Sequence, residues 1–226
     1  MQMVILAGGK GTRLGELTSN TPKCMIKINN KPFLEYQIEL IKDHVTDIII
    51  CAGYLHEHIE RYFGDGSKFG VQIRYSKDDG LGTWGAIKNA NYLLDDTFFV
   101  MYGDSYLPID YSDVEVAFMA SGFPSMMVVY KNEGKYDRSN VLYYDNKVLH
   151  YGYDKDAIYI DYGLSVFSKE CVMYNYGREL KELFCSLISM NKLKGYEVFD
   201  RFYEIGSLNG LIEFEDYVGR PNKEEE

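Results

Sequence analysis

Short apolar runs and one-sided apolar stripes alternate along the N-terminal part of the chain. The run Met3–Leu6 is short and contains branched side chains, which is typical of a buried strand. The segment 34–45 then places apolar residues at spacings of four, three and four, which indicates a helix with one buried face. Further strands are predicted at Asp47–Cys51, 71–75 and Phe98–Tyr102, and further helices at 55–63 and Ala86–Leu94. This order predicts right-handed βαβ units and a parallel sheet.

Two of these helices have candidate N-terminal caps. Asn30 is expected to cap the helix over residues 34–45, with Pro32 in its first turn. Thr83 is expected to cap the helix Ala86–Leu94, because threonine is a favoured residue at that position.

From Met126 onward the pattern changes to short strands separated by turns such as Asp145-Asn146. Close spacing without intervening helices predicts antiparallel pairing. The strands are expected at Met126–Tyr130, Val141–Tyr144, Val148–Tyr151 and Ile158–Phe167, followed by a packing helix over Arg178–Leu193, strands at Gly195–Val198 and Phe202–Glu204, and a last helix Leu208–Val218. No linker or repeat interrupts the chain, so we expect a single domain over residues 1–219 and a polar tail over 220–226.

Composition narrows the class of protein. The 226 residues are 46% hydrophobic and 26% charged, as in an ordinary globular domain. No apolar run approaches the ~18 residues that span a bilayer, and residues 1–7 lack a charged leader. The four cysteines form no C-x-x-C pair and do not combine with histidines at zinc-ligand spacing. We therefore expect a cytoplasmic protein with reduced thiols and no membrane partner.

Charge is distributed unevenly. The formal net charge is −10, which argues against nucleic acid as a partner. Residues 1–31 nevertheless carry five basic side chains against the single acid Glu16. A small polyanion such as a nucleoside triphosphate is expected to be drawn to this region, although a solvated basic face remains an alternative. The basic residues are Lys10, Arg13, Lys23, Lys27 and Lys31.

The glycine-rich stretch 6–14 directly follows the first predicted strand. Free backbone amides in such a turn can cradle phosphate oxygens, and Lys10 and Arg13 add positive charge. It is not a P-loop, because Gly11 rather than serine or threonine follows Lys10. It is not a dinucleotide fingerprint, because Leu14 stands where that pattern has its last glycine. A glycine turn without a ligand remains an alternative for this stretch taken alone.

Asp104 comes directly after the strand Phe98–Tyr102. A carboxylate at the carboxyl end of a strand, in a sheet that binds phosphates, is a natural magnesium ligand. The alternative is an aspartate that caps the next turn.

Several stretches together resemble a known family. They are Leu6–Leu14, Thr21-Pro22-Lys23, Lys31–Glu35, Gly64–Ser67, Leu81-Gly82-Thr83, Tyr102-Gly103-Asp104 and Tyr203–Ser207. In this order they resemble the sugar-1-phosphate nucleotidyltransferases, and the nearest subgroup is that of the heptose-1-phosphate guanylyltransferase-like enzymes. The resemblance implies an α/β fold: a Rossmann-like open mixed sheet of the nucleotide-diphospho-sugar transferase type, with a small antiparallel acceptor-binding portion.

The resemblance also implies a reaction. A nucleoside triphosphate and a sugar 1-phosphate would give a nucleoside-diphosphate sugar and pyrophosphate, for surface polysaccharide synthesis. GTP is the expected nucleotide, with CTP, UTP and dTTP as alternatives. The oligomeric state, including a homo-oligomer, stays open.

Site residues are carried over by matching positions. Arg13, Lys23 and Asp104 are expected to be catalytic, and Asp104 and Glu204 are expected to hold Mg²⁺. Lys155 and Asp161 are expected to bind the acceptor. The expected nucleotide-binding residues are Leu6, Ala7, Gly8, Gly9, Gly11, Thr12, Arg13, Gly82 and Thr83.

The chain departs from the family pattern at three positions. Trp84 replaces a small residue after Leu-Gly-Thr, and either packs in the core or alters the loop near the base. Asp154 stands where glutamate usually precedes the lysine that matches Lys155. Glu204 stands where aspartate is frequent.

Three other functions remain open. A glycosyltransferase would show a second aspartate near Asp104, and the sequence Gly103-Asp104-Ser105-Tyr106 lacks it. A non-catalytic nucleotide sensor is disfavoured by the retained charged residues. Transfer of a nucleotide to a phosphorylated acceptor other than a sugar is not excluded by the residues.

Overall fold

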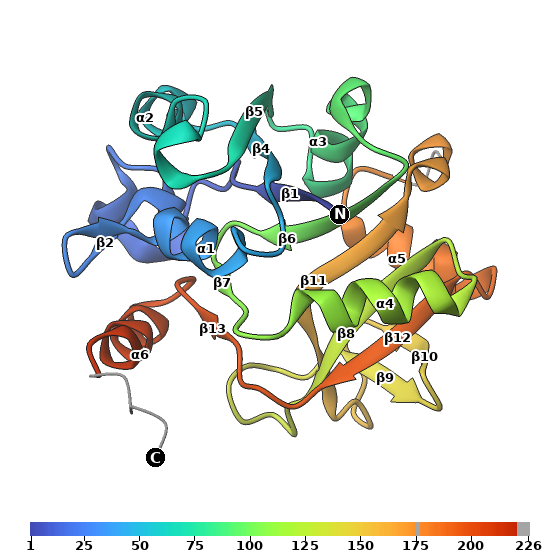
Figure 1. The fold of residues 1–226 in the computed structure, drawn as a ribbon. Coiled ribbons are helices and arrows are strands. Elements are labelled where there is room, and N and C mark those ends of the chain that lie inside the picture. The colour runs from blue at the N-terminus through green and yellow to red at the C-terminus, as the bar shows by residue number, and fades with distance from the viewer. Residues whose placement is uncertain (175–176, 221–226) are drawn as a thin grey trace, which may run out of the picture.

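The computed structural model describes residues 1–174 and 177–220. Its centre is a nine-stranded mixed sheet in the order β5-β4-β1-β6-β11-β8-β12-β10-β9 (Figure 1). The strands span Gln72–Lys77 (β5), Asp47–Ala52 (β4), Gln2–Leu6 (β1), Thr97–Tyr102 (β6), Tyr159–Ser168 (β11), Ser125–Lys131 (β8), Leu193–Val198 (β12), Lys147–Tyr151 (β10) and Val141–Tyr144 (β9). The mixed α/β sheet that the sequence predicts is confirmed.

The two halves of the sheet differ in direction. β5, β4, β1 and β6 run parallel to one another. β11 pairs antiparallel with both β6 and β8, and so joins the parallel half to the second half. The second half is antiparallel apart from β12, which lies parallel to β8. One continuous sheet therefore connects the parts that were expected to hold the nucleotide and the acceptor.

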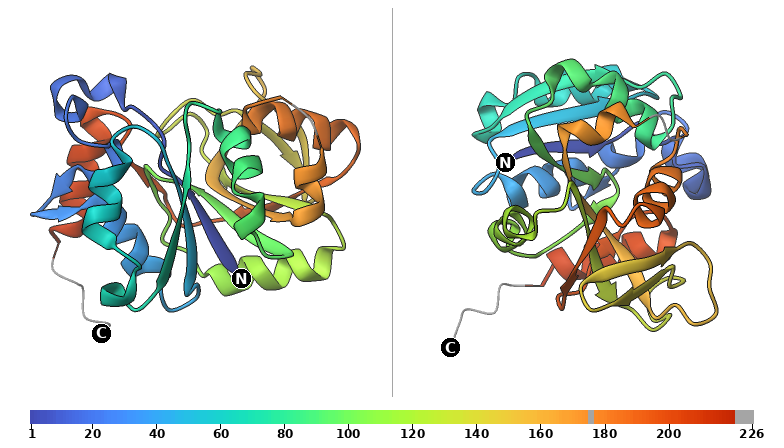
Figure 2. Two further views of the ribbon diagram at one scale, coloured as in Figure 1. Left: turned by 90° about the horizontal axis from the view of Figure 1, so that it is seen from above. Right: turned by 90° about the vertical axis from the view of Figure 1, so that its right-hand side faces the viewer.

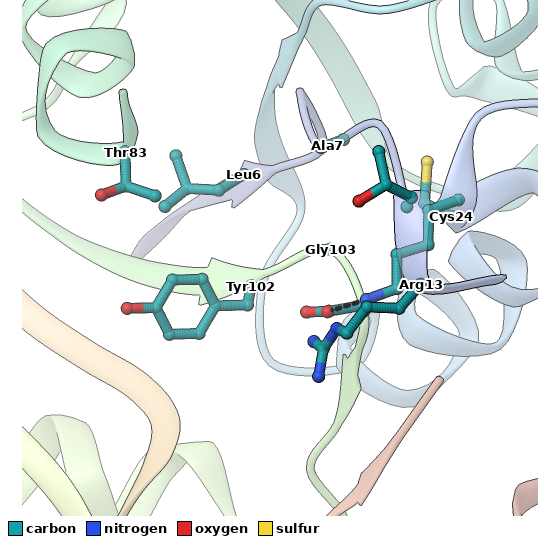
Figure 3. A pocket seen from close by; sticks show the side chains of 12 residues that line it. Leu6, Ala7, Arg13, Cys24, Thr83, Tyr102 and Gly103 are labelled. Atoms are coloured by element: carbon teal, nitrogen blue, oxygen red, sulfur yellow. Dashed lines mark hydrogen bonds and ion pairs between the residues drawn. The ribbon is translucent and has the colours of Figure 1, made fainter. Parts of the chain in front are cut away.

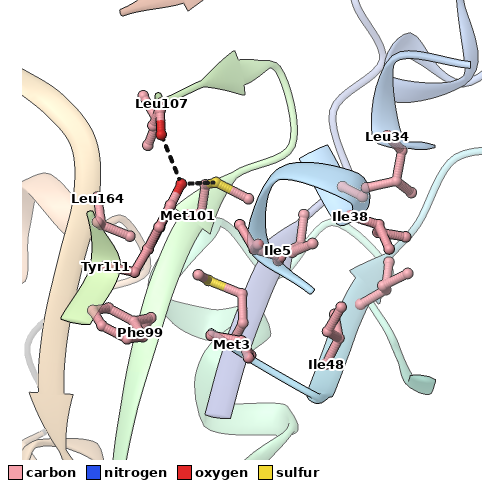
Figure 4. Close-up of a cluster of buried hydrophobic side chains, with 14 of the residues drawn as sticks. Met3, Ile5, Leu34, Ile38, Ile48, Phe99, Met101, Leu107, Tyr111 and Leu164 are labelled. Atoms are coloured by element: carbon pink, nitrogen blue, oxygen red, sulfur yellow. Dashed lines mark hydrogen bonds between the residues drawn. The ribbon is translucent and has the colours of Figure 1, made fainter. Parts of the chain in front are cut away.

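Helices cover both faces of the sheet (Figures 1 and 2). One face packs against α1 (Phe33–Ile41), α2 (His56–Phe63) and α4 (Tyr111–Ser121), and the other against α3 (Thr83–Asn89) and α5 (Leu180–Ser189). Alternating side chains of one strand supply both cores, because Met3 and Ile5 belong to the first and Val4 to the second. Figure 4 shows part of the first core.

A smaller apolar cluster attaches the last helix. α6 (Leu208–Val218) buries Phe214 against Phe33 at the start of α1, with ring centroids 4.9 Å apart. Two short ribbons complete the fold: β2 (Lys27–Ile28) with β3 (Lys31–Pro32), and β7 (Ser105–Tyr106) with β13 (Tyr203–Glu204). None of the described helices is long and apolar enough to cross a bilayer.

The expected helix caps were wrong. Asn30 lies in the turn between β2 and β3 with a positive φ of 66°, and α1 begins only after Pro32. Thr83 is the first residue of α3 rather than its cap, and Gly82 occupies the cap position. The sequence did not indicate α4, nor the 3₁₀ helix Thr12–Thr18 that follows the glycine stretch.

Candidate active site

The glycine-rich stretch forms a compact loop at the carboxyl end of β1. Gly11 has a φ of 63°, which favours glycine, and turns the chain into the 3₁₀ helix. The Thr18 hydroxyl then donates to the carbonyls of Gly11 and Gly15, at 3.0 and 3.2 Å. The folded chain itself thus holds the loop in shape.

A cavity of about 270 Å³ opens where β1 and β6 end (Figure 3). This is the edge of a parallel sheet at which ligands of such folds are held. Its lining residues are Leu6, Ala7, Gly9, Gly11, Thr12, Arg13, Lys23, Cys24, Thr83, Tyr102, Gly103 and Asp104. The structure therefore brings together the three expected catalytic residues and most of the expected nucleotide-binding residues.

Lys23 and Asp104 form an ion pair inside this cavity, drawn as a dashed line in Figure 3. Lys23 follows Pro22 in a short 3₁₀ helix, Lys23–Met25, and only 13% of its side chain is exposed. The side chain of Asp104 is 29% exposed. Asp104 thus faces the cavity and a cation, whereas a turn-capping aspartate would accept a backbone amide.

The cysteine beside this ion pair, Cys24, has a thiol of low reactivity. Burial raises the pKa of the Cys24 thiol to about 12. A thiol whose pKa is raised in this way is protonated near neutral pH and is a poor nucleophile. The described residues also contain no cluster of three or more histidine, cysteine or acidic side chains that could hold a metal.

Glu204 comes from the far end of the sequence and lies next to the site rather than in the lining of the cavity, since it lines a neighbouring hollow with Arg201 and Ser207. β13 pairs it with Ser105, and the amide of Ile205 donates to the Asp104 carbonyl at 3.0 Å. The Glu204 carboxylate accepts from the amide of Gly206 at 2.6 Å. Burial raises its pKa, the neighbouring Asp104 charge raises it further, and the Gly206 amide opposes both. Two carboxyl groups are thus placed on adjacent backbone segments.

The expected acceptor residues are separated. Lys155 lines a different hollow of about 730 Å³, between the loops around Arg138 and Tyr153. Asp161 uses both carboxylate oxygens within the protein, accepting from the Gly163 amide at 2.9 Å and from the Tyr151 hydroxyl at 3.1 Å.

Asp161 does not line the cavity and is connected to it only through other side chains. Burial raises the pKa of Asp161 to about 6, in spite of its two hydrogen bonds. The hydroxyl of its partner Tyr151 is also close to Tyr102, which lines the cavity. The aromatic ring of Tyr102, rather than the Asp161 carboxylate, therefore forms this wall.

A distant segment holds the loop around Gly82. Glu179 accepts from the amide and hydroxyl of Thr83, at 3.1 and 2.8 Å, and the Arg178 carbonyl accepts from the amide of Trp84 at 2.8 Å. These bonds satisfy the free amides at the start of α3. Trp84 is completely buried, so it is a core residue.

The comparison with family models decides the family. Residues 2–137 match the model described as "Nucleotidyl transferase". The chain belongs to the nucleotidyl transferase family.

Curated relatives of this nucleotidyl transferase family member carry out several related transfers. The chain is 39% identical over 118 residues to the D-glycero-alpha-D-manno-heptose 1-phosphate guanylyltransferase of Campylobacter jejuni, and the match covers 51% of this chain and 53% of that protein. It is 43% identical over 124 residues to the UTP--glucose-1-phosphate uridylyltransferase of a Synechocystis strain, covering 49% of this chain and 32% of that protein. The matches therefore span about half or less of these relatives.

A solved structure extends the likeness in fold to the whole chain. The putative glucose-1-phosphate thymidylyltransferase from Bacillus anthracis superposes with a TM-score of 0.87, covering 100% of this chain and 98% of that chain at 20% identity. At that identity the likeness concerns the fold.

The cavity of this nucleotidyl transferase is also lined by residues that the sequence did not predict. Tyr102, Gly103 and Cys24 line the cavity. Tyr102 and Gly103 directly precede Asp104, and Cys24 follows Lys23, so their neighbours in sequence were the available signal. Gly8 and Gly82 are not lining residues. A side chain at Gly8 would collide with Asp78, and one at Gly82 would lie 2.7 Å from the Arg178 carbonyl.

Proposed function

We propose that this protein transfers a nucleotidyl group from a nucleoside triphosphate, preferably GTP, to a sugar 1-phosphate and releases pyrophosphate. The observation that carries the proposal is the convergence of Arg13, Lys23 and Asp104 with the glycine loop in one cavity. Such a cavity suits a polyphosphate, because glycines of the loop and two cationic side chains line it and it lies at the carboxyl edge of a parallel sheet. GTP is preferred because guanylyltransferases are among the relatives of this chain.

The residues of the cavity have separate tasks in this proposal. The loop amides and Arg13 bind the β- and γ-phosphates, which leave as pyrophosphate. Lys23 contacts the α-phosphate and the acceptor oxygen that attacks it. The attacking phosphate is already anionic and needs no general base, so positioning and charge stabilisation account for most of the rate.

The ion pair between Lys23 and Asp104 fits these tasks. Each side chain neutralises the other while no ligand is present, which lowers the cost of holding both in a partly buried cavity. A phosphate oxygen that enters takes over Lys23, and the Asp104 carboxylate is then available to a cation.

The side chains beside the cavity fit Mg²⁺. Magnesium is bound in proteins by one or two carboxylates together with phosphate oxygens and water. Asp104 and Glu204 supply two carboxylates on paired segments. When bound, the ion neutralises phosphate charge. The Gly206 amide already fixes one carboxylate oxygen of Glu204.

The acceptor is proposed to approach from the antiparallel half. Tyr102 offers a flat aromatic wall on that side, next to Tyr151, whose hydroxyl donates to Asp161. Aromatic faces and hydroxyl groups suit the mixed apolar and polar surface of a sugar. Lys155 stays a candidate for the acceptor phosphate if the loop that bears it moves toward the cavity.

Pyrophosphate release tests the proposal. GTP, CTP, UTP and dTTP are each combined with Mg²⁺ and with heptose, mannose or glucose 1-phosphate, and with phosphocholine as a phosphorylated acceptor that is not a sugar. We expect release with GTP and one sugar 1-phosphate, and none when either substrate is omitted. Release only with phosphocholine, or with no pair at all, would contradict the sugar assignment.

A further inference from the structure

Helix α1 contains one polar side chain on its buried face. Gln37 is 0% exposed and lies among Phe33, Leu34, Ile38 and Ile41, all of them completely buried. A buried amide is costly unless it is hydrogen-bonded, so its partners indicate why it is there.

Gln37 donates two hydrogen bonds to the segment that carries Asp104. Its Nε2 lies 2.9 Å from the carbonyl of Tyr102 and 2.6 Å from the carbonyl of Ser105. Tyr102 is the last residue of β6, and Ser105 is the first of β7. One amide group therefore clamps both ends of the turn Gly103-Asp104.

The backbone of this turn is anchored at two further points. The amide of Gly103 donates to the Leu6 carbonyl at 3.0 Å, and the Asp104 carbonyl accepts from Ile205 at 3.0 Å. The four bonds together fix the backbone, while the Asp104 side chain is left to its ion pair with Lys23. Of the four, only the two from Gln37 come from a side chain.

The geometry also fixes how the amide is oriented. Both carbonyls are acceptors, so the NH₂ group must face them. The Oε1 of Gln37 has no hydrogen-bond partner among the described residues. An unpaired buried acceptor is unfavourable, so the two donated bonds outweigh that cost in the folded protein.

We propose that Gln37 is a positioning residue for the Asp104 carboxylate, and through it for the magnesium-bound nucleotide. The inference rests on the proposed function, which makes Asp104 a ligand of the metal. In the proposed function an entering phosphate would draw Lys23 away from Asp104, so the backbone at Asp104 has to stay in place without help from that ion pair. Gln37 provides this support from a helix that does not line the cavity.

The test uses Gln37→Met, which keeps the length of the side chain and removes both donors. Gln2→Met is the matched control, because Gln2 is also a buried amide, donating to Asp47 and to the Leu93 carbonyl. It lies at the amino end of β1, whereas the cavity is at the carboxyl end. Both variants lose buried hydrogen bonds, but only one of them loses bonds to the Asp104 turn.

Calorimetry measures the affinity for a triphosphate in Mg²⁺ and again in EDTA. The probe is whichever of GTP, CTP, UTP and dTTP binds the wild type most tightly in Mg²⁺. The ratio of the two affinities is the gain due to the metal. Loss of a group that orients a metal ligand costs roughly 10–100-fold in metal affinity, so we expect Gln37→Met to lower this ratio at least about tenfold. Gln2→Met should leave it unchanged while lowering the melting temperature.

An unchanged ratio in a folded Gln37→Met variant would overturn the inference. If that variant does not fold, Gln37→Glu replaces it, because glutamate has almost the same volume and turns an oxygen toward the two carbonyls. The same loss is then expected, and an unchanged ratio is again decisive. A wild type that binds a triphosphate with Mg²⁺ but transfers it to no acceptor would defeat the proposed function alone. A wild type that binds none of the four would defeat both.

Discussion

Lys23 is the residue on which the proposed chemistry depends most. It is the cation that the structure places deepest in the cavity, with 13% of its side chain exposed and with Asp104 as its partner. A charge fixed in a partly dry site acts more strongly on a developing negative charge than a solvated one. Its removal also leaves Asp104 without its partner.

Lys23→Ala is expected to lower turnover by roughly 10²–10³, by analogy with the loss of one oxyanion donor. Lys27→Ala is the matched control, because Lys27 is an exposed lysine of the same segment that does not line the cavity. Pyrophosphate release from both purified variants provides the comparison. Equal rates for the two variants would show that the position of Lys23 in the cavity has no catalytic significance.

The ionisation of Asp161 should make the free energy of unfolding depend on pH. Burial raises its pKa to about 6 from an ordinary value of 3.8, so the folded protein holds this proton more tightly than the unfolded chain. Ionisation between about pH 4 and pH 6 therefore costs stability as the pH rises, by about 1–3 kcal/mol for a shift of this size.

Asp161→Asn removes this ionisation and keeps a group that can accept from Gly163. Relative to the wild type, the variant should gain free energy of unfolding as the pH rises from 4 to 6 and show no further gain above about pH 7. Urea unfolding of both proteins at a series of pH values measures the difference. Curves that stay parallel across this range would place the titration elsewhere.

At the scale of elements, the close contact between β1 and β6 sets the floor of the cavity. A Cβ atom at Gly103 would lie 2.8 Å from the Leu6 carbonyl and 3.2 Å from the Cα of Ala7. These are backbone atoms of a central strand and cannot move aside without disturbing the sheet. Gly103 is therefore required by the approach of two strands.

Gly103→Ala is expected to lower the free energy of unfolding by about 1–3 kcal/mol, the usual cost of overpacking. Gly9→Ala is the control, because a Cβ atom there meets no atom within 4 Å. Chemical denaturation of the two variants compares them directly. If Gly9→Ala is the less stable of the two, the contact between β1 and β6 is not the constraint described here.

The sequence predicted those strands and helices that are marked by a pattern of apolar residues within the element itself. β1, β4 and β6 are buried on both faces, and they appear as continuous apolar runs. Helix α4 escaped detection because Val116 and Met119 are exposed, which blurs the buried stripe of Tyr111, Val114 and Phe118. The expected cap at Thr83 was wrong because the amides of α3 are satisfied by a segment distant in sequence.

The same limit applies to the candidate site. Asp104 could be found because it ends an apolar strand, and Lys23 because it follows a recognisable opening stretch. Gln37 gave no signal, since its partners are backbone carbonyls 65 and 68 residues away along the chain. The connection from Asp161 through Tyr151 to Tyr102 depends on side-chain directions across two strands, which periodicity does not specify.

At the scale of the whole molecule, one sheet joins a parallel half and a largely antiparallel half, and the cavity opens where they meet. β6 contributes Tyr102 to its wall and pairs on one side with β1 and on the other with β11. The glycine loop and Arg13 lie on the β1 side, whereas Asp161 lies on β11. In the proposed function, this arrangement brings the triphosphate and the acceptor to opposite sides of one reacting phosphorus.

The most direct measurement of this proposal is ³¹P NMR of the wild type with Mg²⁺, GTP and the sugar 1-phosphate that gives most pyrophosphate. We predict that the signals of both substrates fall together while free pyrophosphate and a new diphosphate diester rise in equal amounts. Asp104→Asn should show neither product. Hydrolysis of GTP to GDP and phosphate without the diester, or an unchanged spectrum at high enzyme concentration, would contradict nucleotidyl transfer at this site.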